Sequence, residues 1–151
     1  MFRQRKNTCK DRAVKYRFLI VEDSLLIAMD LEEAVTRSGH DVIGIAPDMT
    51  VALNYAGDAD IAFVDVRLAD GETGPQIARI LVERGLTVLF VTGNPMLVEG
   101  RDAGALGVIA KPLTHQAAAD VIQFVVDWKD GRPRNPPARL KLFQPLSSST
   151  A

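Results

Sequence analysis

The sequence predicts an α/β protein with a doubly wound sheet of five parallel strands. Short apolar runs alternate with longer amphipathic ones from Phe18 onward. The short runs are apolar at nearly every position, which is typical of parallel strands covered on both faces. Five such β–α units in about 110 residues suit an open doubly wound sheet better than a closed barrel of eight units.

Each strand is predicted from one short apolar run. The run FLIV gives the first strand, DVIGI the second, DIAFV the third, TVLFV the fourth and GVIA the fifth. Connections of only a few residues join these runs to the helical segments, as in compact α/β domains. The predicted strands cover residues 18–21, 41–45, 60–64, 87–91 and 107–110.

The helices are predicted from apolar residues at three- and four-residue spacing between the strands. The first helix has Ser24 as a suitable N-cap and Gly39 in the C′ position that ends helices. Its apolar face is expected to hold Leu26, Met29, Leu31 and Val35. The predicted helices cover residues 24–38, 48–56, 74–84, 95–103 and 115–128.

Composition narrows the class of protein. A chain of 151 residues is long enough for one domain with a real core, and 47% hydrophobic with 25% charged residues is typical of a globular protein. A single cysteine, Cys9, excludes an intrachain disulfide and a cysteine-based zinc site. No apolar run approaches the roughly 20 residues of a membrane span, and no signal peptide is recognisable. These features predict a cytoplasmic protein.

Both ends of the chain differ from the middle. Residues 1–16 form a basic N-terminal arm that we expect to be disordered, and residues 129–151 form a Pro/Ser-rich tail. We therefore predict that residues 17–128, between the arm and the tail, form the folded domain. The arm has neither interleaved aromatic residues nor a following helix-turn-helix, which argues against nucleic-acid binding. Within the tail, residues 139–143 (RLKLF) are apolar enough for a docking strand or a short helix.

Polar side chains follow four of the five predicted strands. Glu22 and Asp23 follow the first, Asp65 the third, Thr92 the fourth and Lys111 the fifth. In doubly wound sheets the ligand site lies at the carboxyl ends of the strands. We therefore expect these five side chains to lie together at one edge of the sheet.

Two explanations of the acidic pair are open: the acids cap the following helix, or they hold a charged group. Three carboxylates close together repel one another, and a hard divalent cation relieves the repulsion. Asp23 and Asp65 are suited to bind Mg²⁺ (or Mn²⁺) directly, and Glu22 through water. Asp65 is then placed to attack a phosphoryl group as a carboxylate nucleophile. The phosphoryl oxygens would meet the charge of Lys111 and the hydroxyl of Thr92.

The motifs VED, FVDV, FVTG and AKP, in this order and spacing, resemble the receiver domain of two-component response regulators. The resemblance covers about residues 17–128 and implies a flavodoxin-like (βα)5 fold with strand order 2-1-3-4-5. It implies Asp65 as the phosphorylation site and a metal bound by Glu22, Asp23, Asp65 and the backbone carbonyl of Arg67. It also implies a cis bond between Lys111 and Pro112. The loops DVRLADGETG and FVTGNP look most like stand-alone receivers of the α-proteobacterial Phe-x-Thr-Gly type.

This resemblance implies a phosphorelay signalling protein. A sensor histidine kinase or a phosphotransfer protein would supply the phosphoryl group, and a downstream protein target would be contacted. Apart from Mg²⁺-dependent self-phosphorylation and slow autodephosphorylation, no enzymatic activity is expected. Neither a DNA-binding domain nor a membrane contact is expected. A homodimer is left open, as is the choice between phosphate sink, relay and direct effector.

The sequence departs from the family pattern at Val108, where receivers usually carry a Tyr or Phe that reports phosphorylation. We therefore expect the signal to leave through the loop after Thr92, with Met96, Leu97 and Val108 as the output surface. The alternative is that the apolar residues after this loop are simply the buried side of the following helix: Pro95, Met96, Leu97 and Val98. Gly71 and Gly74 suggest a mobile connection after the third strand.

Three other functions compete with this hypothesis. A receiver fold that acts as an interaction module without phosphorylation is favoured mildly by Val108 and opposed by the intact polar set. A haloacid-dehalogenase phosphatase needs a second acid two residues after its nucleophile, and Arg67 occupies that position. A flavin-binding flavodoxin needs a phosphate loop where this chain has Glu22 and Asp23.

Overall fold

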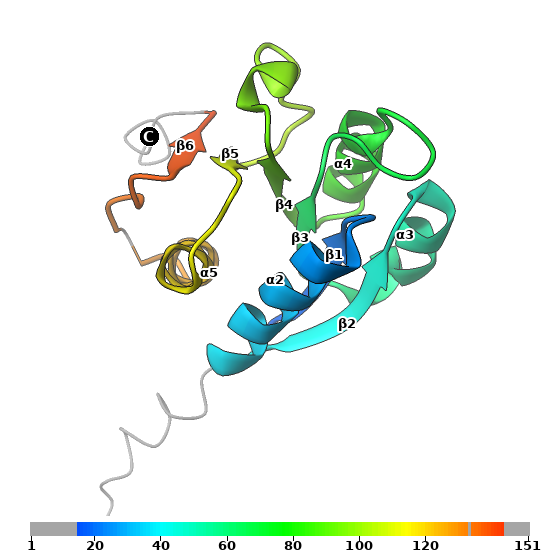
Figure 1. Cartoon of the computed structure of the whole chain (residues 1–151). Helices are drawn as coiled ribbons and strands as arrows, with labels where there is room; N and C mark the ends of the chain where they lie inside the picture. The colour runs from blue at the N-terminus through cyan, green and yellow to red at the C-terminus, as the bar shows by residue number, and fades with distance from the viewer. Residues whose placement is uncertain (1–14, 133, 144–151) are drawn as a thin grey trace, which may run out of the picture.

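The structure is a computed structural model that describes residues 15–132 and 134–143. A central sheet is covered by helices on both faces (Figure 1). The strands are β1 (Arg17–Val21), β2 (Asp41–Ala46), β3 (Ile61–Val64), β4 (Thr87–Thr92), β5 (Gly107–Ala110) and β6 (Leu140–Leu142). The helices are α2 (Leu25–Arg37), α3 (Met49–Tyr55), α4 (Gly74–Glu83) and α5 (His115–Lys129), with 3₁₀ turns η1 (Ala56–Asp58) and η2 (Pro95–Val98).

The strand order in the sheet is β2-β1-β3-β4-β5-β6. Strands β1 to β5 pair in parallel, and this confirms the predicted doubly wound sheet and its order 2-1-3-4-5. The order reverses between β1 and β3, so that the carboxyl ends of these neighbouring strands border the switch point. Strand β6 extends the predicted sheet by pairing antiparallel with β5.

The two faces of the sheet build two apolar clusters. One lies under α2 and α5 and contains Phe18, Phe63 and Phe124. The other lies under α3 and α4 and contains Val64, Phe90 and Ile77. Because side chains of a strand alternate between the faces, strands with apolar residues at successive positions fill both clusters at once.

Two helices begin at side-chain caps that the sequence supplies. The carboxylate of Asp48 accepts a hydrogen bond from the Val51 amide, and the hydroxyl of Thr114 accepts one from Ala117. Ser24 occupies the predicted N-cap position of α2, but its side chain makes no capping hydrogen bond with the described residues. The Ser24 amide donates to Glu22 Oε2 instead. The acid therefore takes part in starting the helix as well as in the site.

The predicted inward face of α2 is wrong in its first two turns. Ala28, Leu31 and Val35 form the buried stripe, at the i, i+3, i+7 spacing of a helix face. Leu26 and Met29 were expected on this stripe but are 78% and 51% exposed. Each residue of an α-helix turns by about 100°. Leu26, two residues before Ala28, and Met29, one residue after it, therefore point away from the buried stripe.

The predicted helix over residues 95–103 is also wrong, because only the short η2 turn forms there. Glu99 is already extended, and Gly100, Ala103 and Gly104 have φ values of 76°, 56° and 85°. A right-handed helix cannot continue through positive φ angles. The apolar spacing of Pro95–Val98 therefore describes a single turn.

The C-terminal residues that the structure describes return to the sheet. Residues 139–143, for which the sequence left open a strand or a helix, contain β6. Residues 1–14 of the predicted arm and 144–151 of the predicted tail lie outside the described residues. Among the helices that are described, none is both long and apolar enough to cross a membrane.

Candidate functional site

The backbone at the carboxyl ends of β1, β2 and β3 fixes where the acids stand. The amide of Asp65 donates to the carbonyl of Val21 over 2.9 Å, and the amide of Glu22 donates to Ala46 over 2.9 Å. These bonds continue the parallel ladders one residue past the strands. Glu22 and Asp65 therefore leave adjacent strands at the same level.

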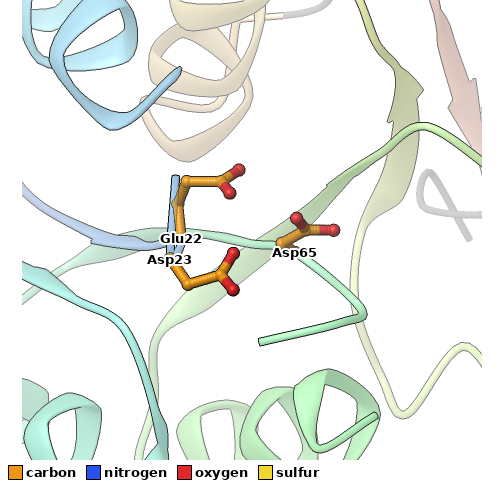
Figure 2. A group of neighbouring side chains, drawn as sticks. All are labelled: Glu22, Asp23 and Asp65. Atoms are coloured by element: carbon orange, nitrogen blue, oxygen red, sulfur yellow. The ribbon is translucent and has the colours of Figure 1, made fainter. Parts of the chain in front are cut away.

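Glu22, Asp23 and Asp65 form one acidic group. Each offers a carboxylate oxygen, and these oxygens lie within 4.8 Å of one another. Figure 2 shows the three side chains together at the ends of their strands. Glu22 and Asp65 are 3% and 9% exposed, whereas Asp23 is open to solvent. The group is thus buried on one side and accessible on the other.

Lys111 reaches into this acidic group from the end of β5. Its Nζ atom donates to Glu22 Oε1 over 2.7 Å and to Asp65 Oδ2 over 2.8 Å. Its backbone amide donates to the carbonyl of Thr92, and its bond to Pro112 is cis, as the family resemblance implied. The second oxygen of Asp65, Oδ1, accepts from the Val66 amide over 2.7 Å. Both oxygens of Asp65 are therefore held in place.

The charges in the site influence one another. Burial raises the pKa of Glu22 and the charge of Asp65 raises it further, against the opposing hydrogen bonds from Lys111 and Ser24. Burial lowers the pKa of Lys111, but its hydrogen bonds to Asp65 and Glu22 outweigh this effect and leave that pKa above its ordinary value. The lysine therefore stays charged, while ionising Glu22 costs free energy.

The donor set fits a hard divalent cation. Three carboxylates within this distance carry more negative charge than one ammonium balances, and carboxylate oxygens are the ligands that Mg²⁺ prefers. The exposure of Asp23 leaves one side of the acidic group open to the waters that Mg²⁺ usually keeps.

Thr92 lies at the end of β4, beside β5, and is 3% exposed. Its hydroxyl oxygen accepts a hydrogen bond from the Asn94 amide over 3.2 Å. The hydroxyl proton is a donor that this bond does not use. Thr92 thus joins the site edge to the loop that follows β4.

The remaining predicted residues lie in the loops after β3 and β4 and in strand β5. Arg67 is exposed in the loop after β3, and its side chain pairs with Glu72 over 3.4 Å. Met96 is 73% exposed in η2 and Leu97 is half-buried. Val108 is 3% exposed, in the middle of β5. Of the three residues expected at the output surface, Met96 is thus the most exposed, whereas Val108 is buried.

Gly74 is a site residue that the sequence analysis did not identify. A Cβ atom on Gly74 would lie 2.1 Å from the backbone oxygen of Asp65, so a side chain there would displace that backbone. The Gly74 amide also donates to the carbonyl of Val66 over 3.0 Å. The sequence suggested a mobile connection at Gly71 and Gly74, but Gly74 is buried against the backbone that carries Asp65.

Comparison with known proteins identifies the family. Residues 18–123 match the response regulator receiver domain. The chain belongs to this family. The phyllosphere-induced regulator PhyR of Methylorubrum extorquens is 36% identical to the receiver over 109 residues, which are 69% of this chain and 41% of PhyR. The transcriptional regulatory protein PdtaR of Mycobacterium tuberculosis is 29% identical over 124 residues, which are 79% of this chain and 60% of PdtaR.

Solved structures show the same fold. The signal receiver domain of a modulated diguanylate cyclase from Desulfovibrio desulfuricans superimposes with a TM-score of 0.68 at 28% identity. That match covers 78% of this receiver and 98% of the other chain. The receiver spans about two fifths and three fifths of the lengths of PhyR and PdtaR.

Proposed function

We propose that this receiver accepts a phosphoryl group on Asp65 with the help of Mg²⁺ (or Mn²⁺) and signals through contacts with other proteins. The observation that carries the proposal is the convergence of Glu22, Asp23, Asp65 and Lys111 at the carboxyl edge of the sheet. A buried carboxylate flanked by an ammonium and two further acids is suited to take up a phosphoryl group.

The transfer balances as a substitution at phosphorus. A carboxylate oxygen of Asp65 forms a bond to phosphorus, and the bond between phosphorus and the donor's nitrogen or oxygen breaks. The donor leaves with the electron pair. Lys111, now bound to Asp65 Oδ2, neutralises charge on the phosphoryl oxygens, and Thr92 donates its unused hydroxyl proton to one of them.

Glu22, Asp23, Asp65 and the backbone carbonyl of Arg67 are the groups that would hold the metal. When bound, Mg²⁺ would supply positive charge next to the phosphoryl oxygens. Glu22 and Asp23 would bind and orient it, while the Val66 amide keeps Oδ1 of Asp65 in place through the 2.7 Å hydrogen bond. The chemistry is limited to self-phosphorylation and slow hydrolysis of the resulting acyl phosphate.

The surface beside Asp23 supports a protein as the phosphoryl donor, either a sensor histidine kinase or a phosphotransfer protein. Leu25, Leu26 and Met29 are 65%, 78% and 51% exposed on the first turns of α2. Adjacent exposed apolar side chains at the rim of a site are typical of a surface that a partner covers. We propose Met96 and Leu97, with Val108 beneath, as the surface for a downstream target.

Intact-mass measurement tests the proposal directly. The protein is incubated with acetyl phosphate, with and without Mg²⁺, alongside Asp65→Asn and the control Asp58→Asn, whose acid is exposed in η1. We expect a gain of one phosphoryl group that needs Mg²⁺, occurs in the control and is absent in Asp65→Asn. If neither acetyl phosphate nor a cognate kinase adds the group, the receiver is a phosphorylation-independent interaction module.

A further inference from the structure

Residues 134–143 form a segment, here called the C-terminal strap, that follows α5 and runs along the outer edge of the sheet. Figure 1 shows its strand β6 beside β5. Leu140, Lys141 and Leu142 pair with Ile109, Val108 and Gly107 of β5. At its start, Arg134 pairs with the buried carboxylate of Asp127 on α5 over 2.6 Å. The strap is thus fixed at both ends of its course.

The strap contributes to both apolar clusters. Leu140 is 5% exposed and packs into the cluster under α2 and α5, with Leu142 beside it. Phe143 packs against the opposite cluster, and its ring meets Phe90 edge-on with centroids 6.3 Å apart. One short segment thus contacts the apolar clusters on both faces of the sheet.

Gly107 shows that β5 is built to receive this segment. A Cβ atom on Gly107 would lie 2.5 Å from the carbonyl oxygen of Lys141 and 3.3 Å from Cα of Leu142. The glycine therefore allows a backbone approach that alanine would prevent. Gly107 pairs with Leu142 of β6, so the glycine stands within the paired segment itself.

Arg139 connects the strap to the functional site. Its Nη1 atom donates to the carbonyl of Pro112 over 2.8 Å and to the carbonyl of Ala110 over 3.3 Å. These two residues flank Lys111, whose ammonium binds Glu22 and Asp65. One guanidinium therefore holds the backbone on both sides of the lysine that would meet the phosphoryl group.

We propose that Arg139 holds Lys111 in its unphosphorylated position against Glu22 and Asp65, so that docking of the C-terminal strap and phosphorylation of Asp65 oppose each other. The inference rests on the proposed function.

A phosphoryl group on Asp65 would lie between that carboxylate and Lys111. The lysine must therefore leave its present position, where its Nζ atom lies 2.8 Å from Asp65 Oδ2. The backbone from Ala110 to Pro112 then shifts, which weakens the two hydrogen bonds to Arg139. Because coupling is reciprocal, loosening the strap favours phosphorylation.

Hydrogen exchange of the full chain tests the coupling. Exchange of the amides of residues 140–143 is measured with Mg²⁺ alone and with Mg²⁺ and acetyl phosphate, and the intact mass is recorded on the same sample. We expect exchange to accelerate at least about five-fold on phosphorylation, the lower end of usual coupling strengths, and to stay unchanged in Asp65→Asn. A phosphorylated protein with unchanged exchange overturns the coupling alone. A protein that takes up no phosphoryl group overturns the proposed function and the coupling together.

Matched variants test the reverse direction. Gly107→Ala drives the strap backbone away, and Gly57→Ala is its control because no described atom lies within 4 Å of a Cβ at Gly57. Arg139→Gln removes the guanidinium at the site. Arg132→Gln is its control, because the exposed Arg132 side chain pairs with Asp130 only at 3.8 Å.

We expect Gly107→Ala and Arg139→Gln to raise exchange at residues 140–143. With acetyl phosphate present, they should also raise the steady-state ratio of phosphorylated to unphosphorylated protein about five-fold, while both controls match wild type. If the strap is purely structural, the variants lower stability but leave the steady-state ratio of phosphorylated to unphosphorylated protein unchanged, and this would overturn the proposal. If Gly107→Ala does not fold, Arg139→Gln decides the outcome alone, since its side chain is exposed.

Discussion

The Nζ atom of Lys111 lies 2.7 Å from Oε1 of Glu22, although 89 residues separate the two in the chain. The same atom lies 2.8 Å from Asp65 Oδ2. One ammonium thus serves two buried carboxylates, and Asp23 adds a third acid beside them. The free energy of unfolding should therefore respond both to protons and to a metal ion at this site.

The raised pKa of Glu22 predicts a pH dependence of stability in the metal-free protein. The folded protein holds the Glu22 proton more tightly than the unfolded chain does, for which the ordinary pKa is 4.5. This contribution to stability is fully present below pH 4.5 and is lost as pH rises through the folded pKa. Glu22→Gln should therefore show a free energy of unfolding that falls less from pH 4.5 upward than that of wild type.

Urea titrations at a series of pH values, without divalent ions, measure this difference. Glu33→Gln is the control, because Glu33 is exposed and pairs with Arg37 on the surface of α2. The raised pKa of Lys111 acts only above its ordinary value of 10.5 and lies outside this window. Parallel curves for wild type and Glu22→Gln would contradict the prediction.

Magnesium is expected to stabilise the folded receiver. A ligand that binds only the folded state at 100 times its Kd adds about 2.7 kcal/mol to the free energy of unfolding. Asp23→Asn removes an exposed ligand charge without leaving a buried group unpaired, so most of this gain should disappear. Thermal unfolding with and without Mg²⁺ measures it, and Asp58→Asn should behave as wild type. Equal gains in all three proteins would exclude a metal site at the acidic group.

The site could be predicted from the sequence because a parallel sheet collects the residues that follow its strands. Asp65 follows β3 and Lys111 follows β5, so neither position depends on the exact ends of the helices. The strand order, in contrast, could be predicted only from the resemblance to the receiver family. Apolar runs show which segments are strands, but they do not show which strands pair.

What could not be predicted depends on contacts between distant segments. In the sequence, Gly74 looks like any loop glycine. Only the structure shows that a Cβ atom at Gly74 would lie 2.1 Å from the backbone oxygen of Asp65. The orientation of α2, with Leu26 exposed, depends on which side meets the sheet. The η2 turn has the apolar spacing of a helix. The helix does not continue because the backbone has positive φ angles at Gly100 and Gly104.

Gly74→Ala is expected to disturb the site through the backbone. The added methyl group would collide with the carbonyl oxygen of Asp65 and with Val66 Cα at 2.6 Å. Such overpacking costs about 1–3 kcal/mol. A displacement of Asp65 by about 1 Å would also slow phosphorylation about 100-fold.

Chemical denaturation and the rate of phosphorylation by acetyl phosphate measure the two effects of Gly74→Ala. Gly57→Ala controls for the loss of a glycine, because the added methyl group meets no described atom within 4 Å. Loss of stability without a slower reaction would show that Gly74 supports the fold but does not position Asp65.

Two leucines test whether the C-terminal strap belongs to the folded core. Leu140 is 5% exposed against the cluster under α2 and α5, whereas Leu26 is 78% exposed on α2. Truncating a buried leucine to alanine removes apolar contact and leaves a cavity, so Leu140→Ala should lower the free energy of unfolding by about 2 kcal/mol. Leu26→Ala should change it by less than about 0.5 kcal/mol. Urea unfolding of both variants measures the difference. If Leu140→Ala were as harmless as Leu26→Ala, β6 would not be packed in solution, and the coupling through Arg139 would lose its structural basis.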